Sequence, residues 1–159
     1  MTERPVITRS LSIAGEPETL YDLIADVTRM GEWSPACTGG TWDEGAGPTV
    51  GSWFTGHNKY GDRAYDTRCQ ITAADRPNTI AWMAGGADEG ITEWRYRFQP
   101  TDGGTEVTET WTMLRDLPQP AGDSAAAGMD PEELRRRMLE NFGSGIEQTL
   151  ASLKASVEG

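Results

Sequence analysis

Apolar and polar residues alternate along most of the chain, and near both ends this alternation gives way to helical spacing. Residues 5–13 alternate, with Ile7, Leu11 and Ile13 on one face. Arg9 interrupts that face. The pattern predicts a first strand that carries one charged residue on its buried side.

Helical spacing follows this strand. Pro17 suits the first position of a helix, and apolar residues then recur at i, i+3, i+4 and i+7, at Leu20, Leu23, Ile24 and Val27. A second helical turn is expected over residues 28–33, ending before Pro35, because the residue before a proline avoids helical backbone angles. The sequence thus predicts two short helices after the first strand.

From Gly40 to Leu114, short alternating segments rich in tryptophan are separated by turn residues. We expect six strands here, at residues 40–44, 50–59, 65–74, 79–84, 91–99 and 105–114. The connections between them are too short to hold crossover helices. The strands must therefore run antiparallel.

The last predicted element is a long helix over residues 131–157. Asp130 can cap it and Pro131 suits its first position. Apolar residues then recur every three or four positions, at Leu134, Met138, Phe142, Ile146, Leu150, Leu153 and Val157. Such a helix is about 40 Å long and can cross a whole sheet. Gly143 and Gly145 interrupt it, which indicates either a close approach to a strand or a bend.

This order of elements predicts an α+β fold of the helix-grip type, in one domain over residues 1–159. A curved antiparallel sheet of six to seven strands wraps around the long C-terminal helix, and the two short helices follow the first strand. A single helix does not fill the concave side of such a sheet. We therefore expect an apolar cavity between the helix and the sheet, where small ligands bind.

Charge and composition exclude several classes of function. Lys and Arg total 14 against 25 Asp and Glu, a net charge of −11, which disfavours nucleic acids and anionic membrane surfaces as partners. No export signal and no run of 18 apolar residues occurs, so we expect a cytoplasmic protein without integral membrane association. Cys37 and Cys69 form no C-x-x-C pair. They can form one disulfide, although two reduced thiols fit a cytoplasmic chain better, and no motif predicts a metal or a cofactor.

Four segments carry a resemblance to a known superfamily: RSLSIAGEPETLYDLIADVTRMGEWSP, ITAADRPNTIAW, WRYRFQPTDGGTEVTETW and TLASLKASVE at the end of the last helix. Together they span nearly the whole chain, which resembles bacterial members of the SRPBCC superfamily. That superfamily includes polyketide cyclases/dehydrases, START lipid-transfer domains and the birch-pollen-allergen fold. The resemblance implies a helix-grip fold, and a monomer or homodimer that binds an apolar molecule such as a sterol, polyketide, hormone or quinone. The cyclases share no short motif that matches here, so no catalytic residue is assigned.

Glu109 is the most informative ionisable residue in the sequence. It shares a predicted face with Val107, Trp111 and Met113, where an acid is costly unless it is paired. Arg9 has the same unusual position on the first strand, which neighbours the last strand in this fold, so an inward Arg9–Glu109 pair is expected. Such a pair either only shapes the pocket floor or binds a polar group of the ligand. In a further alternative, Glu109 acts as a base with a raised pKa.

The remaining candidates line the expected cavity or lie close to it. His57, the only histidine, alternates with Phe54 and so faces solvent if Phe54 faces inward. Aromatic walls suit flat or polycyclic apolar ligands. The residues predicted to contact a ligand are Arg9, Trp33, Phe54, Asn58, Thr67, Trp82, Trp94, Tyr96, Glu109, Trp111, Met138 and Phe142. The loop at residues 115–130 is expected near the cavity mouth, as a gate or as a simple connector.

Three functions remain open. The first is binding or transport of an apolar small molecule that resembles a lipid, a polyketide or an aromatic compound. The second is an enzyme of the polyketide cyclase/dehydratase type that uses an acid in the cavity. The third is a protein-interaction or co-chaperone-like module, which would need a filled interior and a large exposed apolar patch.

Overall fold

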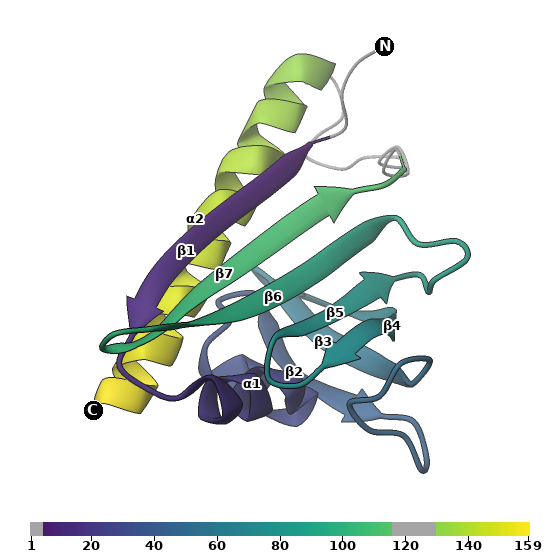
Figure 1. The fold of residues 1–159 in the computed structure, drawn as a ribbon. Coiled ribbons are helices and arrows are strands. Elements are labelled where there is room, and N and C mark those ends of the chain that lie inside the picture. The colour runs from purple at the N-terminus through teal and green to yellow at the C-terminus, as the bar shows by residue number, and fades with distance from the viewer. Residues whose placement is uncertain (1–4, 116–129) are drawn as a thin grey trace.

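A computed structural model describes residues 5–115 and 130–159 (Figure 1). The helices and strands are, in chain order, β1 (Val6–Ile13), α1 (Pro17–Ala25), the 3₁₀ helix η1 (Val27–Glu32), β2 (Cys37–Trp42), β3 (Trp53–Tyr60), β4 (Arg63–Asp75), β5 (Thr79–Ala84), β6 (Thr92–Thr101), β7 (Gly104–Met113) and α2 (Pro131–Glu158). The predicted α+β helix-grip fold is confirmed. The interior of the predicted loop, at residues 116–129, lies outside the described residues.

One antiparallel sheet contains all seven strands, in the order β1-β7-β6-β5-β4-β3-β2. β1 and β7 are distant in sequence but pair along their whole length, with Ile7 opposite Trp111 and Leu11 opposite Val107. This confirms the expectation that the first and last strands are neighbours. Every strand therefore contributes one face to the concave side of a single curved sheet.

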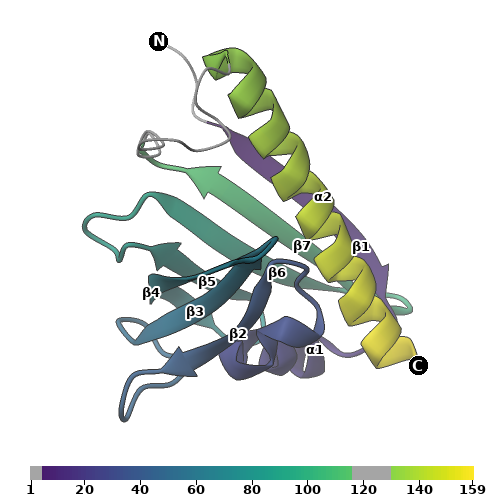
Figure 2. The same cartoon turned by 180° about the vertical axis from the view of Figure 1, so that it is seen from behind.

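Helix α2 lies along the β1–β7 edge of the sheet, and the remaining strands turn away from it (Figures 1 and 2). Asp130 caps the helix as predicted, since its side chain accepts a hydrogen bond from the Glu133 backbone N–H. At Gly143 the helix comes close to a strand, which is one of the two explanations that the sequence allowed for this glycine. A Cβ added there would lie 3.8 Å from Ile7 Cγ2 and 3.1 Å from Arg9 Nη2, both on β1.

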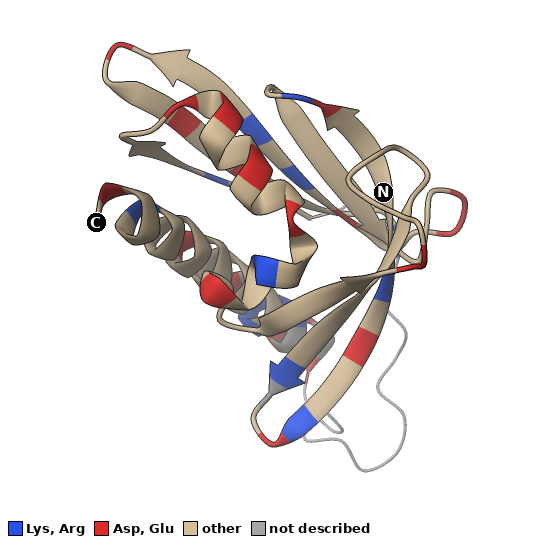
Figure 3. Ribbon diagram, turned by 90° about the horizontal axis from the view of Figure 1, so that it is seen from below, with Lys and Arg blue, Asp and Glu red and all other residues tan. Residues whose placement is uncertain are grey.

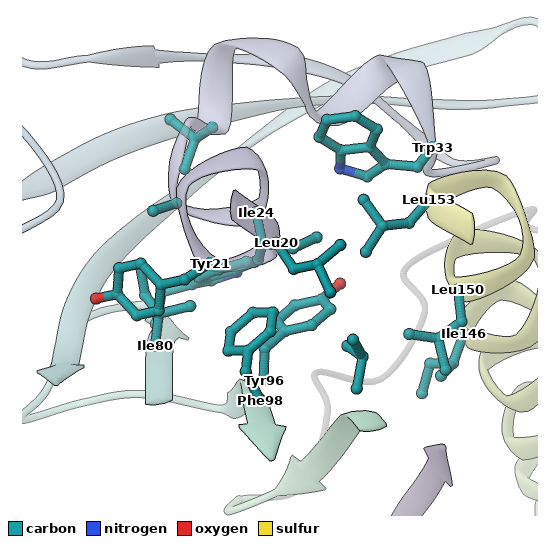
Figure 4. Close-up of a cluster of buried hydrophobic side chains, with 14 of the residues drawn as sticks. Leu20, Tyr21, Ile24, Trp33, Ile80, Tyr96, Phe98, Ile146, Leu150 and Leu153 are labelled. Atoms are coloured by element: carbon teal, nitrogen blue, oxygen red, sulfur yellow. The ribbon is translucent and has the colours of Figure 1, made fainter. Parts of the chain in front are cut away.

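The main core lies between the C-terminal half of α2 (residues 143–158), α1 and the middle of the sheet. Figure 4 shows Ile146, Leu150 and Leu153 projecting from α2 toward Leu20 of α1. On the other side of α1, Tyr21 packs edge-on against Phe98 of β6, with ring centroids 5.7 Å apart. These contacts pack the C-terminal half of α2 against α1, and α1 against the sheet.

Several predicted boundaries were wrong. The strand expected at 40–44 begins earlier, at Cys37, and contains a bulge between Cys37 and Gly39 that breaks the alternation. The strand expected at 65–74 runs over Arg63–Asp75, because the preceding turn is tight, with Gly61 at a φ of 60°. The second short helix is a 3₁₀ helix that starts at Val27, after Asp26 caps it.

Acidic residues are spread over helices, strands and loops, with no single face that holds them all (Figure 3). Within the described part of the chain, no helix is both long and apolar enough to cross a bilayer.

Candidate functional site

The concave face of the sheet presents rows of inward side chains that cross several strands. One row runs from Ile7 on β1 through Trp111 on β7 and Trp94 on β6 to Trp82 on β5. The next row places Glu109 of β7 between Arg9 of β1 and Tyr96 of β6. Strand register thus collects most of the predicted ligand-contacting residues on one surface.

Two sets of aromatic rings line this surface. In the first, Phe142 of α2 stacks on Trp111, with ring centroids 4.7 Å apart and an interplanar angle of 17°, and lies edge-on to Trp94 at 5.9 Å. In the second, Trp82 lies between Phe54, at 5.9 Å, and Tyr96, at 5.6 Å. The aromatic wall that the sequence predicted is therefore present, and α2 joins it through Phe142.

The inward side chains are not all buried. Trp94, Asn58, Thr67, Met138 and Phe142 remain partly exposed although they point to the inside. By contrast, Trp111, Glu109 and Val107 are almost completely buried. The concave side is therefore filled beneath the C-terminal half of α2, and further toward its N-terminal half the inward side chains keep part of their surface exposed.

Glu109 is a buried polar residue on this inner face. It is 2% exposed, and its Oε1 atom has no hydrogen-bond partner among the described residues. Burial raises the pKa of its carboxyl group to about 8, and a hydrogen bond from the Tyr96 hydroxyl opposes this rise only in part. Glu109 therefore keeps its proton at neutral pH.

Tyr96 is the only described hydrogen-bonding neighbour that acts on the Glu109 carboxyl. Burial, followed by the nearby Glu109 charge, holds the pKa of Tyr96 well above its usual value. Figure 4 shows Tyr96 beside Phe98, both projecting from β6 into the interior. Tyr96 and Glu109 thus form a pair of neutral hydroxyl-bearing groups in an otherwise aromatic setting.

The expected Arg9–Glu109 ion pair is wrong, although the two residues lie opposite each other in the register. The Arg9 side chain passes outward across Gly143 of α2, and its Nε donates to Glu147 Oε1 at 3.1 Å. Arg9 Nη1 donates to the Thr8 carbonyl at 2.9 Å. Both partners of the Arg9–Glu147 pair are substantially exposed, so Arg9 lies on the outer seam between β1 and α2.

Two further polar residues lie on the opposite wall. Asn58 Nδ2 of β3 donates to Thr67 Oγ1 of β4 at 3.0 Å. Both side chains are partly buried, and Tyr65, two positions before Thr67, is 47% exposed. Asn58 and Thr67 thus form a hydrogen-bonded polar pair on the inner face of β3 and β4, and their contact with a ligand stays a prediction.

Trp33 lies apart from these residues. It is 3% exposed and points toward Leu153 at the C-terminal half of α2 (Figure 4). The Arg29 guanidinium lies 5.4 Å from the centroid of its ring. Trp33 therefore contributes to the main core, on the far side from Phe142.

His57 faces outward, as its alternation with Phe54 predicts. Its Nδ1 lies 2.9 Å from Asp66 Oδ1, and its Nε2 lies 2.8 Å from Thr41 Oγ1. The ring is held by strands on both sides and is 41% exposed. It has no access to the concave face.

Cys37 is partly buried and reduced, in line with the two reduced, packed thiols that the sequence favours. Its thiol is close enough to influence the pKa of Tyr96, and burial raises its own pKa. Burial raises the pKa of Cys69 to about 12, and both cysteines are free thiols. The sequence did not place Cys37 in a strand, because the bulge after it interrupts the alternation of β2.

Two hollows formed by the described residues lie away from Trp94, Tyr96, Glu109 and Phe142. No group of three or more His, Cys, Asp or Glu side chains among them is arranged to hold a metal ion. A hollow of about 260 Å³ is lined by Tyr21, Asp22, Ala25, Asp26, Trp42, Pro48, Ala74 and Arg76. Its mouth is bordered by the Arg76–Asp22 ion pair, and neither Tyr96 nor Glu109 contributes to its lining.

Comparison with known proteins identifies the family to which this arrangement belongs. A family model described as polyketide cyclase/dehydrase and lipid transport matches residues 4–158. The polyketide-cyclase-like protein Cgl2372 from Corynebacterium glutamicum is 32% identical, with 99% of this chain and 94% of that chain covered and a TM-score of 0.66. Among proteins with curated descriptions, none matches the sequence.

Two more distant structures share the fold. The di-domain ARO/CYC StfQ from the steffimycin biosynthetic pathway is 17% identical, with a TM-score of 0.76, and the match covers 96% of this chain and 50% of StfQ. Protein NE0264 from Nitrosomonas europaea is 11% identical, with 94% and 92% of the chains covered and a TM-score of 0.69. At these identities the likeness concerns the fold alone.

Proposed function

The chain belongs to the polyketide cyclase/dehydrase and lipid transport family, and from this membership we propose that it binds a flat, largely apolar small molecule. The binding region is the inner site, which we define as the part of the concave face formed by Asn58, Thr67, Trp94, Tyr96, Glu109 and Phe142. Trp111 stacks on Phe142, and Trp82 packs beside Tyr96, so both contribute to its aromatic walls.

The observation that carries this proposal is the partial exposure of aromatic rings on the inside of the sheet. Trp94 and Phe142 point inward and still keep accessible surface. Aromatic rings release substantial free energy when they are covered, and they stack preferentially on flat partners. A ring system that enters beside Trp94 and Phe142 buries this surface as well as its own.

The polar residues of the inner site orient the bound molecule. Asn58 and Thr67 lie on β3 and β4, and Tyr96 and Glu109 lie on β6 and β7. Ligand pockets typically combine apolar walls with a few such convergent polar groups. A molecule with oxygen atoms at its two ends and an apolar middle is the natural complement.

The proposal is tested by calorimetric titration of the purified protein with 2-acetylnaphthalene and with 2-ethylnaphthalene. We expect saturable binding at one site per chain. Trp94→Leu should weaken binding by about tenfold or more, since the variant removes a wall of the site. Trp53→Leu is the matched control, because Trp53 lies on the outer face of β3 beside Arg68.

Two results would overturn the proposal. One is a complete absence of binding by these naphthalenes. The other is an equal loss of affinity in Trp94→Leu and Trp53→Leu, which would indicate binding outside the inner site.

A second candidate function, a cyclase/dehydratase, is favoured by Glu109 alone. A buried carboxylic acid that keeps its proton near neutral pH can protonate the departing hydroxyl of a β-hydroxy ketone, so that water leaves and a C=C bond forms. The carboxylate that results then recovers the proton lost from the α-carbon. Under this alternative, Glu109→Gln should abolish loss of water from a bound β-hydroxy ketone while binding of 2-acetylnaphthalene persists.

A co-chaperone-like module receives less support. The large apolar residues that are exposed in the described chain are Val6, Val50 and Tyr65, which lie on three separate segments. An interaction surface of that kind needs a contiguous apolar patch.

A further inference from the structure

Glu109 Oε1 is a buried polar atom for which the fold itself supplies no partner. Leaving such an atom without a hydrogen bond costs about 1–3 kcal/mol. The side chain is 2% exposed, so solvent does not satisfy it either. An unsatisfied group on the inner face is a specific place for a ligand atom to bind once the side chains that cover it move aside.

The groups that surround Glu109 determine its charge. From β6, Tyr96 donates to the carboxyl group, and from β1, Arg9 is turned away toward Glu147. From α2, the residues on the inner side are Phe142 and Ile146, whereas Glu147 points outward and is occupied by Arg9. The Cys37 thiol acts on Tyr96 and is itself neutral. No described cation therefore compensates a negative charge on Glu109.

The two carboxyl oxygens consequently have different roles. Tyr96 donates a hydrogen bond to the group, and Oε1 is the oxygen without a partner. A proton placed on Oε1 makes it a hydrogen-bond donor. The carboxylic acid then offers one free O–H to a ligand.

Building on the proposed function, we propose that Glu109 acts as a neutral hydrogen-bond donor that selects ligands with an uncharged carbonyl oxygen at their inner end. A ketone or quinone oxygen accepts the Oε1–H and satisfies the atom. A carboxylate at that position would be desolvated without a cation beside it, so the site rejects it. A ligand ammonium would instead require Glu109 to release its proton.

The same arrangement makes recognition of the carbonyl depend on pH. Below about pH 8 the acid keeps its proton and donates to the ligand, and above that value it becomes an acceptor that repels the carbonyl oxygen. A ligand without a carbonyl oxygen accepts no hydrogen bond from Glu109. Its affinity should therefore respond little to pH over this range.

The experiment compares four probes that share one ring system: 2-acetylnaphthalene, 2-ethylnaphthalene, 2-naphthoate and 2-naphthylmethylammonium. At about pH 6 we expect the ketone to bind about tenfold more tightly than the ethyl compound and the carboxylate to bind more weakly than either. At about pH 9.5 the advantage of the ketone should be lost, while the affinity of the ethyl compound stays constant.

Two variants assign the effect to Glu109. Glu109→Gln keeps an N–H donor without a titrating proton, so it should retain the preference for the ketone at both pH values. Glu109→Leu is similar in volume and has no donor, so it should bind both compounds equally well. Glu106→Gln, on the exposed face of β7, is the matched control and should behave like the wild type.

The possible failures are distinguishable. Equal binding of ketone and ethyl compound at about pH 6, or tighter binding of the ammonium than of the ketone, overturns the role of Glu109 and leaves the inner site standing. Absence of binding by all four probes overturns the proposed function and this inference together.

Discussion

Arg9 and Glu109 lie directly opposite each other in the β1–β7 register, yet the Arg9 side chain pairs with Glu147 on α2. The arginine reaches Glu147 by crossing the helix at Gly143, where the absence of a side chain leaves space for the guanidinium. The positive charge consequently lies on the outer seam of the protein, and the acid stays inside without a counter-ion. The chemistry of the inner site follows from this separation.

The first prediction concerns the outer pair. Arg9→Ala should lower the free energy of unfolding by about 1 kcal/mol or less, because the Arg9–Glu147 bridge is solvent-exposed. Urea denaturation at neutral pH measures this difference, with Glu147→Ala expected to match it. A loss of several kcal/mol in Arg9→Ala alone would mean that the arginine compensates a buried charge on Glu109.

The second prediction concerns the pH dependence of stability. The Glu109 carboxyl has an ordinary pKa of 4.5 when unfolded and about 8 when folded. Between these values the unfolded chain has lost the proton and the folded chain keeps it, so stability falls as pH rises from about 4.5 to about 8. Below this range both states are protonated, and above it the loss is complete.

Glu109→Gln removes this titration. Its free energy of unfolding should exceed that of the wild type by an amount that grows from about pH 5 to about pH 8, since each unit of pKa difference corresponds to roughly 1.4 kcal/mol. Urea denaturation across this range, with Glu106→Gln as control, provides the measurement. Parallel pH profiles for wild type and Glu109→Gln would show that Glu109 titrates normally.

The third prediction uses the two glycines of α2. Gly145→Ala should stabilise the protein by about 1 kcal/mol, because alanine favours the helix and its Cβ would lie 3.8 Å from Pro35 Cγ, an ordinary contact. Gly143→Ala should gain less, since its Cβ would lie 3.1 Å from Arg9 Nη2 and displace that side chain.

Combining Gly143→Ala with Arg9→Ala tests the cause of that smaller gain. Without the guanidinium, the alanine should recover most of its stabilising effect relative to Arg9→Ala alone. Thermal unfolding measures these differences. If Gly143→Ala and Gly145→Ala stabilise the protein equally, Arg9 does not pack against Gly143.

Periodicity was sufficient to predict the fold and the orientation of the key acid. Strict alternation with Val107 and Trp111 placed Glu109 on the inner face, and the spacing from Met138 to Leu153 placed Phe142 on the inner side of the last helix. These predictions succeed because strand and helix geometry decide which face a residue occupies.

The pairing of Arg9 could not be predicted in this way. A long flexible side chain chooses among partners according to where the helix lies across the sheet, and periodicity does not give that position. Gly143 carried the relevant signal, since a glycine within a helix permits close approach, but the alternative of a bend fitted the sequence equally well. The start of β2 at Cys37 was missed for a related reason, because a bulge interrupts the alternation there.

The six tryptophans of the chain make the central claim directly measurable. We would follow the indole N–H signals by two-dimensional NMR during titration with 2-acetylnaphthalene, assigning each signal by a Trp→Phe variant. Our account predicts saturable shifts for Trp94, at the inner site, and for Trp111, which stacks on Phe142 behind it, and a constant signal for Trp53 on the outer face. Shifts confined to Trp53, or an unchanged spectrum at saturating probe, would contradict it.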